Sequence, residues 1–535
     1  MPSPERRFRI ATLLWLLVPA ALMLAATRGS TAPGAIVVGL LTGYLAVAIP
    51  QTIFLVVATL LTQRMFQRGE RTRARRWLEG ILSVPAVAGS WAKRYPRMWL
   101  MQLHASEGRL DDAVAVGRAM LGRNARKGLF QITAGGEVTW RDTMADWLDA
   151  LGRPEEAATE RARADACLAE AAGSPEGVCA RADRLLRAHR YTEASKLLES
   201  RLGAIPAAQA IQKHNYLARL MNAASFSGRL RDMLRWADVY LRGEPKPNAT
   251  ARTSIEVWQT TVVTRLGALA EAEQRARATL GHARDQRPSA LALLGWVVLR
   301  LGRLDEAQEI LDEAVALTPI GSPLTIPRFY RALLSAVRGQ TDEAITPLRK
   351  LLESVSPFNP VEQINERRWI AIPLAELEAE SGQADRAWER LQAAGHGQAT
   401  DPVNGPRWEA AAALVLAHRG DREAALAHLA RGAARRDEPT EDLTAKLAVL
   451  ATLGRAALAL GEPVRAEEFL RAALDLGPDP VDRPALLLGL GQALRLRGDE
   501  AGAQAAWREA VADGHGTAAA RRSADLLTGV GVSPL

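Results

Sequence analysis

A short pattern, in which a glycine is followed five residues later by an alanine, recurs along most of this chain. Clear copies begin at Gly108, Gly152, Gly302, Gly339 and Gly461. When the weaker copies between them are included, successive turn positions lie 35 to 44 residues apart, which predicts stacked helix-turn-helix units. The expected turn positions are Gly69, Gly108, Gly152, His189, Gly228, Gly267, Gly302, Gly339, Gly382, Gly420, Gly461 and Gly498.

Composition agrees with an all-α fold. Alanine, leucine, arginine and glutamate dominate, and aromatic residues make up only 5% of the chain, so helix is favoured almost throughout. We therefore expect a helical solenoid of about 11 to 12 units over residues 63–515. A capping helix and tail are expected over residues 516–535.

Three stretches of the chain resemble the tetratricopeptide repeat. The matching residues are Leu294, Gly295, Gly302, Ala307, Leu311, Ala314 and Pro319; then Leu453, Gly454, Gly461, Ala466, Leu470, Ala473 and Pro478; then Leu490, Gly491, Gly498, Ala503, Trp507 and Ala510. This resemblance implies a scaffold that binds protein or peptide partners on the inner faces of its first helices.

The repeat pattern has a physical basis. A small residue such as Gly295 in the first helix and an alanine in the second together let the two helices approach closely. The turn glycine accepts the left-handed backbone that ends the first helix. We expect Asp305 and Glu306, just after one such turn, to cap the second helix and complement its dipole.

Two apolar stretches precede the repeats. Residues 10–27 and 35–62 carry no charged side chain, and the short connector between them contains only Arg28. Each stretch is long enough to cross a bilayer. The basic residues 1–9 and the arginines after residue 62 predict a transmembrane hairpin with both ends in the cytoplasm. A cleavable signal peptide at residues 1–27 is the alternative. Gly39 and Gly43 suit either packing within the hairpin or dimerisation.

The basic charge is concentrated beside these stretches. Residues 1–80 contribute +7 of the net charge of +8, so the remaining chain is nearly neutral and no nucleic-acid partner is expected. The lipid bilayer is the expected partner of this charge. The candidate membrane-surface residues are Arg64, Arg68, Arg71, Arg73, Arg75 and Arg76.

The sequence contains no catalytic or cofactor motif of substance. Phosphate loops, dinucleotide-binding glycines, nucleophile elbows and zinc signatures are all missing, so no enzyme activity, cofactor or metal is expected. Asp475, Asp479 and Asp482 flank prolines and indicate a solvated link between repeats.

Candidate binding residues come from the expected groove. Ala218 and Asn222 occupy positions where a carboxylate-clamping subset of the family has a lysine and an asparagine, so that clamp is not expected. An acidic face on residues 139–151 would receive a basic segment, although a solvated face is the plainer interpretation. The candidate groove residues are Trp99, Asp142, Asp146, Asp149, Asn222, Trp258, Trp296, Phe329 and Trp369.

Two functions fit this organisation. The first is a membrane-anchored interaction scaffold at a bacterial inner membrane, with its solenoid in the cytoplasm. The second is an accessory or regulatory subunit of a membrane enzyme or transporter, with the hairpin as the specific contact. The sequence leaves open whether the protein forms a homo-oligomer. The layout of the first 80 residues is similar to that of HemY-type membrane proteins, but no role is carried over from it.

Overall fold

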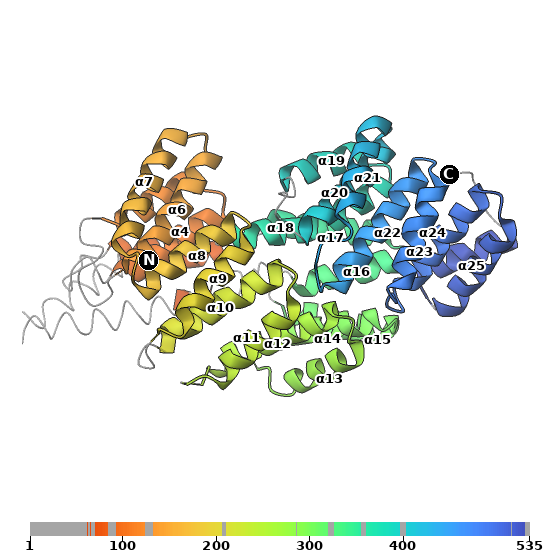
Figure 1. Ribbon diagram of the computed structural model, residues 1–535. Coiled ribbons are helices and arrows are strands. Elements are labelled where there is room, and N and C mark those ends of the chain that lie inside the picture. The colour runs from red at the N-terminus through yellow and green to blue at the C-terminus, as the bar shows by residue number, and fades with distance from the viewer. Residues whose placement is uncertain are drawn as a thin grey trace, which may run out of the picture. The chain divides into compact units, whose positions relative to one another are not determined.

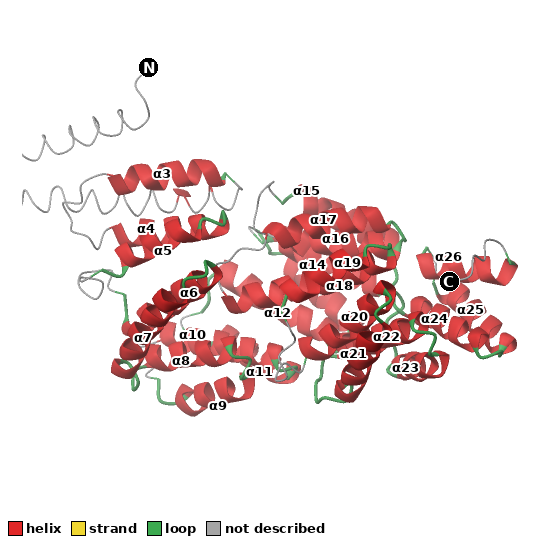
Figure 2. Ribbon diagram, turned by 90° about the horizontal axis from the view of Figure 1, so that it is seen from above, coloured by secondary structure: helices red, strands yellow, loops and turns green. Residues whose placement is uncertain are grey.

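The computed structural model describes residues 61–62, 65, 70–83, 93–122, 132–205, 210–244, 246–284, 286–318, 326–354, 360–395, 403–514 and 516–529. In these ranges the regular structure is helical, as Figure 2 shows, and no strand occurs. The described chain is thus an all-α, tetratricopeptide-like solenoid. It separates into two compact units that divide after Ala180.

The first unit is built from helices that pair along the chain (Figure 1). Neighbouring helices α4 and α5, and α6 and α7, pack against each other. The helices of this unit are α3 (Arg71–Ser83), α4 (Arg94–Ser106), α5 (Leu110–Met120), α6 (Ala134–Ala150) and α7 (Pro154–Glu170), followed by the start of α8 (Pro175–Arg187).

The second unit continues the pairing to the end of the described chain. Its core is formed by leucine, valine and alanine side chains between successive helices. The helices are α9 (Tyr191–Leu202), α10 (Ala210–Phe226), α11 (Leu230–Arg242), α12 (Ala249–Arg265), α13 (Leu269–Leu280), α14 (Arg287–Arg300), α15 (Leu304–Ala316), α16 (Ile326–Val337), α17 (Thr341–Ser354), α18 (Pro360–Glu380), α19 (Ala384–Ala393), α20 (Asn404–Arg419), α21 (Arg422–Arg435), α22 (Leu443–Ala459), α23 (Pro463–Asp475), α24 (Arg483–Leu496), α25 (Glu500–Asp513) and α26 (Ala518–Thr528).

The expected turn positions have the expected backbone. Every one from Gly108 to Gly498 has a positive φ, including His189 at 56°. A left-handed residue at this point ends the first helix of each pair. The turn prediction is confirmed for these positions, while Gly69 lies outside the described residues.

The small residues of the first helices also behave as predicted. A Cβ atom on Gly295 would lie 2.6 Å from the Cγ atom of Leu311, and one on Gly454 would lie 2.7 Å from the Cγ atom of Leu470. The two helices of a unit therefore approach too closely for a side chain at these positions.

The capping role expected for Asp305 and Glu306 is wrong. Helix α15 has no side-chain cap at its start. Asp305 instead binds Arg338 at 2.5 Å, and Glu306 binds Arg277 at 2.8 Å. Both carboxylates still lie in the first turn, where they complement the helix dipole.

Within the second unit, the turns of earlier repeats contact the links of repeats that follow about five units later. Glu441 accepts hydrogen bonds from the backbone and side chain of Arg231, at 2.7 and 2.9 Å. Arg265 binds Asp442 at 2.8 Å. Arg300 binds Asp479. We call these pairs the inter-turn contacts; they join residues 177 to 210 positions apart.

One inter-turn contact corrects a prediction. Asp479 is buried rather than solvated, because the solenoid returns to cover the link that carries it. Arg300, itself buried, supplies the matching charge. Of the three aspartates expected in a solvated link, Asp475 is exposed and Asp482 also approaches Arg300, at 3.2 Å.

Among the described residues, no helix is both long and apolar enough to cross a bilayer. The two stretches expected to form the hairpin, residues 10–27 and 35–62, lie outside the described residues except for positions 61 and 62. Arg64 and Arg68 also lie outside them.

Candidate partner-binding groove

The second unit contains a pocket of about 410 Å³ that is lined by helices from distant parts of the chain. Helices α10, α11, α12 and α14 contribute one group of lining residues, and α18, α20 and α22 contribute the other (Figure 1). Helices α12 and α22 pack directly against each other. We call it the tryptophan pocket because Trp258, Trp296 and Trp369 all line it.

Two of these three rings are unusually exposed. Trp258 is 40% exposed and Trp369 is 36% exposed, whereas Trp296 is only 7% exposed. Large aromatic side chains in a folded protein are normally buried, and exposed ones in a concave surface are typical of binding sites. The lining of the pocket therefore includes two exposed tryptophans and a buried third.

Aromatic packing holds these rings in place. Trp296 stacks on Tyr330 with ring centres 5.1 Å apart, and Trp369 stacks on Phe329 at 5.0 Å. Tyr330 also meets Trp369 edge to face at 6.2 Å. Burial raises the pKa of Tyr330, so this ring stays neutral. Phe329 is buried beneath Trp369 and does not line the pocket itself.

The polar groups of the pocket come from both sides. Asn222, Ser225 and Thr261 line it from α10 and α12, while Asn404 and Thr444 line it from α20 and α22. Amide and hydroxyl groups can donate and accept hydrogen bonds, so they can satisfy a peptide backbone that enters an otherwise apolar site.

Charge in the pocket comes from two arginines and one aspartate. The Arg265 guanidinium is already engaged, because it donates to Asp442 at 2.8 and 3.0 Å and to Ser225 Oγ at 2.9 Å. Arg407 is the second arginine. Asp442 is buried and also caps helix α22 by accepting from the backbone N–H of Ala445 at 3.0 Å.

The remaining predicted groove residues belong to the first unit. Trp99 is partly buried and packs on the core cluster that includes Leu100 and Leu103. Asp142 is buried in α6. Asp146 and Asp149 both bind Arg161 of α7, Asp146 at 3.3 Å. The predicted acidic face is therefore already paired within the chain.

The described arginines of the predicted membrane-surface set lie on α3. Arg73 and Arg76 are exposed, Arg73 binds Glu70 at 2.9 Å, and Arg75 binds Glu107 at 2.6 Å. Arg71 is half-buried. Of the four described arginines of this set, only Arg73 and Arg76 are thus exposed.

Sequence reasoning missed the far wall of the pocket. Asn404, Arg407, Asp442 and Thr444 lie far along the chain from Trp258 and Trp296. The repeat pattern predicts contacts only between consecutive units. It does not say how many units complete one turn of the solenoid, so it cannot predict which distant units meet. The charge pairs of the inter-turn contacts were the only available signal.

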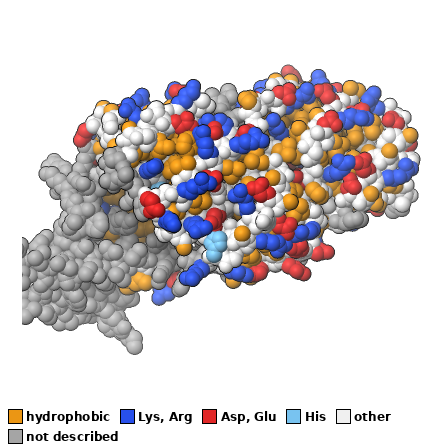
Figure 3. All heavy atoms as spheres, turned by 60° about the horizontal axis from the view of Figure 1, so that its bottom comes forward, with side chains coloured by type: hydrophobic (Ala, Val, Ile, Leu, Met, Phe, Trp, Pro, Cys, Tyr) orange, Lys and Arg blue, Asp and Glu red, His pale blue; other side chains and the backbone are white. Residues whose placement is uncertain are grey.

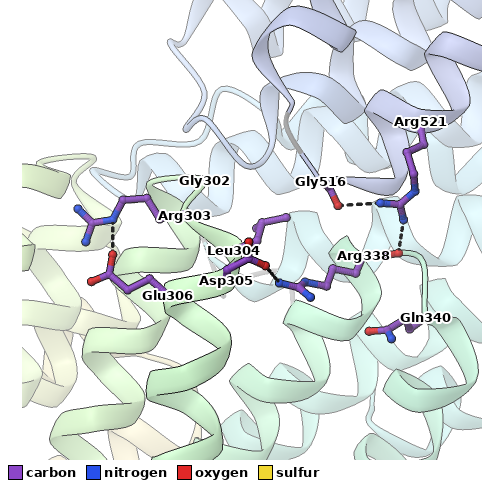
Figure 4. Close-up of a pocket in the computed structure, with 9 residues that line it drawn as sticks. All are labelled: Gly302, Arg303, Leu304, Asp305, Glu306, Arg338, Gln340, Gly516 and Arg521. Atoms are coloured by element: carbon purple, nitrogen blue, oxygen red, sulfur yellow. Dashed lines mark hydrogen bonds and ion pairs between the residues drawn. The ribbon is translucent and has the colours of Figure 1, made fainter.

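A second hollow of about 700 Å³ lies where the turn after α14, the turn after α16 and the link before α26 meet. Figure 4 shows that its arginines are bound to groups of the hollow itself. Arg338 binds Asp305 at 2.5 Å, and Arg521 donates to the carbonyl oxygens of Gly516 and Arg338 at 2.9 and 2.5 Å. These bonds brace the solenoid, and leave the tryptophan pocket as the better binding site.

The surface carries no extended area of one charge on the face seen in Figure 3. Lysine and arginine side chains there are interspersed with aspartate and glutamate, and apolar side chains lie between them. On this face, therefore, no single charge forms a continuous stripe.

Comparison with known proteins identifies the repeat. Residues 288–320 match the family model described as tetratricopeptide repeat; these residues cover α14, α15 and the turn at Gly302. No curated protein matches the sequence.

Several solved structures are similar in fold. They include the Cut9 and Hcn1 hetero-tetramer of APC/C, at 15% identity and a TM-score of 0.43, covering 98% of this chain and 96% of that one. The human IFIT1 dimer with PPP-AAAA has 15% identity and a TM-score of 0.36, with 79% and 90% covered. Yeast Tom70 has 12% identity and a TM-score of 0.31, with 89% and 95% covered. Similarity at this level indicates no shared function.

Proposed function

We propose that this protein is an interaction scaffold that binds a peptide segment of partner proteins in the tryptophan pocket. One observation carries the proposal. Trp258, Trp296 and Trp369 come from three separate helices and line one pocket, and two of the rings are more than one-third exposed.

Physical chemistry favours binding over catalysis at this pocket. Tryptophan supplies a large apolar contact at a low cost in conformational entropy, and it is enriched among residues that dominate binding energy. The rings are held by stacking on Tyr330 and Phe329, so a partner would meet a preformed surface and lose little free energy in ordering it.

Site-specific photocrosslinking tests this proposal. The full-length protein would carry a benzophenone amino acid in place of Trp258, in its native membrane fraction, and crosslinked peptides would be identified by mass spectrometry. We expect a defined partner segment that crosslinks at this position. Its crosslink should be lost when Trp369→Ala is added, because the same segment contacts both rings.

Val464 and Leu496 provide matched controls. Both are exposed apolar residues, at 64% and 56%, outside the pocket. A benzophenone at either position should not capture the same segment. Equal capture at Val464, Leu496 and Trp258 would mean that the pocket is not the binding site.

We further propose that residues 10–27 and 35–62 tether this scaffold to a bacterial inner membrane, with the repeats in the cytoplasm. The support is their length and lack of charge, together with the arginines that flank them. A reporter fused after Leu535 would be active only inside the cell; activity only outside would refute this topology.

Exchange of the hairpin separates scaffold from subunit. If residues 1–62 are replaced by an unrelated two-helix anchor, a scaffold keeps its partner crosslinks at Trp258. An accessory subunit that uses the hairpin as its specific contact loses its complex even though the pocket is intact.

A further inference from the structure

Arg407 of helix α20 lies in the wall of the tryptophan pocket. Its side chain is half-buried. No hydrogen bond or ion pair joins it to another residue in the part of the chain that the structure describes. Burial lowers the pKa of Arg407, and the charge of Arg265 lowers it further.

Two carboxylates, Glu376 and Asp442, act electrostatically on Arg407, but both already bind other residues. Asp442 accepts both hydrogen bonds from Arg265. Glu376 is bound by Arg455, and its other oxygen accepts from the hydroxyl of Thr452 at 3.2 Å. Arg407 therefore retains donors that nothing in the pocket satisfies, and leaving a partly buried guanidinium unmatched costs free energy.

The charge balance of the pocket selects the kind of anion. Among the lining residues that the structure describes, Arg265, Arg407 and Asp442 together leave one net positive charge. One carboxylate neutralises this charge, and its two oxygens match the guanidinium fork. A phosphate monoester carries nearly two negative charges at neutral pH, so it would need a second available cation that the lining does not supply.

We propose that Arg407 binds the carboxylate of an aspartate or glutamate side chain in the partner peptide, while an adjacent apolar side chain of that peptide packs on Trp258 and Trp369. This inference rests on the proposed function and names the class of peptide that the pocket takes.

The polar lining favours an acidic side chain within a peptide over a free carboxyl terminus. Asn222 and Thr261 lie on one wall, and Asn404 and Thr444 lie on the other. Hydrogen-bonding groups on both walls suit a backbone that continues past the arginine in both directions.

A peptide array tests the inference with the full-length protein in detergent. The probes are N-acetylated, C-amidated octapeptides in which Trp, Phe or Leu is followed by Glu, with matched arrays that carry Gln or phosphoserine in place of Glu. A fourth array carries the Gln peptides with a free carboxyl terminus. We expect the wild type to bind the Glu peptides about tenfold more tightly than the Gln peptides, as a charged hydrogen-bonded pair provides. Arg407→Gln should remove this preference while it keeps the binding of the Gln peptides.

The array distinguishes failure of the inference from failure of the proposed function. Equal binding of Glu and Gln peptides, with binding lost in Trp258→Ala, would overturn the role of Arg407 and leave the pocket as a peptide site. Binding of no probe, or binding unchanged in Trp258→Ala, would overturn both. Tighter binding of phosphoserine peptides, or of Gln peptides with a free carboxyl terminus, would overturn the assignment to an acidic side chain.

Thermal unfolding gives an independent readout. Since no carboxylate among the described residues binds Arg407, Arg407→Gln should melt at the same temperature as the wild type or higher. Arg455→Gln is the matched control, because Arg455 binds Glu376 and also Glu380, at 2.7 Å, and it should melt lower. A marked loss of stability in Arg407→Gln would show a structural partner and overturn the inference.

Discussion

His189 is the one non-glycine residue with a positive φ in the described chain. It occupies the turn between α8 and α9, where the other repeats have glycine. Its ring explains the exception, since Nδ1 lies 2.6 Å from the hydroxyl of Tyr191 and the two buried rings meet edge to face at 5.7 Å. A buried hydrogen bond thus offsets the strain of a left-handed backbone.

This balance predicts that His189→Gly destabilises the protein. Relief of backbone strain gains about 1 kcal/mol, but the buried hydrogen bond between Tyr191 and His189 is lost, at a cost of about 1 to 3 kcal/mol. Chemical denaturation should therefore give a lower free energy of unfolding. In a Tyr191→Phe background the same change should become neutral or stabilising; a stabilised single variant would contradict the argument.

The close approach of α14 and α15 predicts opposite effects for one substitution at two sites. Gly295→Ala should destabilise by about 1 to 3 kcal/mol, because the new Cβ atom would press on Leu311. Gly80→Ala in α3 meets no atom within 4 Å and should stabilise by about 0.5 to 1 kcal/mol. Thermal melts of both variants check this, and equal effects would contradict it.

At the scale of helices, α20 and α21 are joined by a buried charged group. Glu409 lies 2.7 Å from Nδ1 of His428 and accepts from Nε of Arg431 at 3.1 Å. Burial alone would raise the pKa of Glu409, but the hydrogen bonds from His428 and Arg431 outweigh it, so this pKa is lowered.

A carboxyl group whose pKa is lower in the folded protein stabilises the folded state at pH values above its pKa in the unfolded chain, about 4.3. This stabilisation is lost as the pH falls through the pKa of the group in the folded protein. We expect Glu409→Gln to lower the free energy of unfolding by about 1 to 3 kcal/mol at pH 7, with the difference shrinking below pH 4. Denaturation at several pH values measures this. Glu500→Gln at an exposed site is the control, and a difference that stays constant with pH would refute the account.

Helices and turns were predictable because their causes are local. The glycine and alanine spacing set the helix pairs, and each predicted turn position from Gly108 to Gly498 has a left-handed backbone. Gly395 and Gly477, which also have a positive φ, were not predicted because they lie in the links between units. The sequence could not predict that Asp305 and Glu306 form ion pairs and do not cap helix α15. These ion pairs depend on Arg338 and Arg277, which other repeats place beside the two carboxylates.

At the scale of the molecule, the solenoid returns on itself within the second unit, and this return determines which residues line the pocket. Trp258, Trp296 and Trp369 were expected in a groove because of their positions in the repeats. Arg407 and Asp442 were not, because their helices, α20 and α22, lie beside α12 and α14 only where the solenoid returns on itself. Asp479 was misassigned to solvent for the same reason.

The inter-turn pair of Arg300 and Asp479 therefore carries a large prediction. Both residues are buried and lie 179 positions apart. Arg300→Ala should destabilise the second unit by about 3 to 5 kcal/mol, because a buried carboxylate loses its partner. Arg300→Met with Asp479→Leu should recover most of this loss. Denaturation curves measure both, and a single variant as stable as the wild type would mean that the contact is dispensable.

The central claim is that the tryptophan pocket binds partner peptides. Isothermal titration of the full-length wild type, Trp258→Ala and Val464→Ala, each with the synthetic segment recovered by crosslinking at position 258, tests it most directly. Loss of a central tryptophan contact costs about 2 kcal/mol or more, so we predict at least about tenfold weaker binding for Trp258→Ala and unchanged binding for Val464→Ala. Equal dissociation constants for all three proteins would contradict the account.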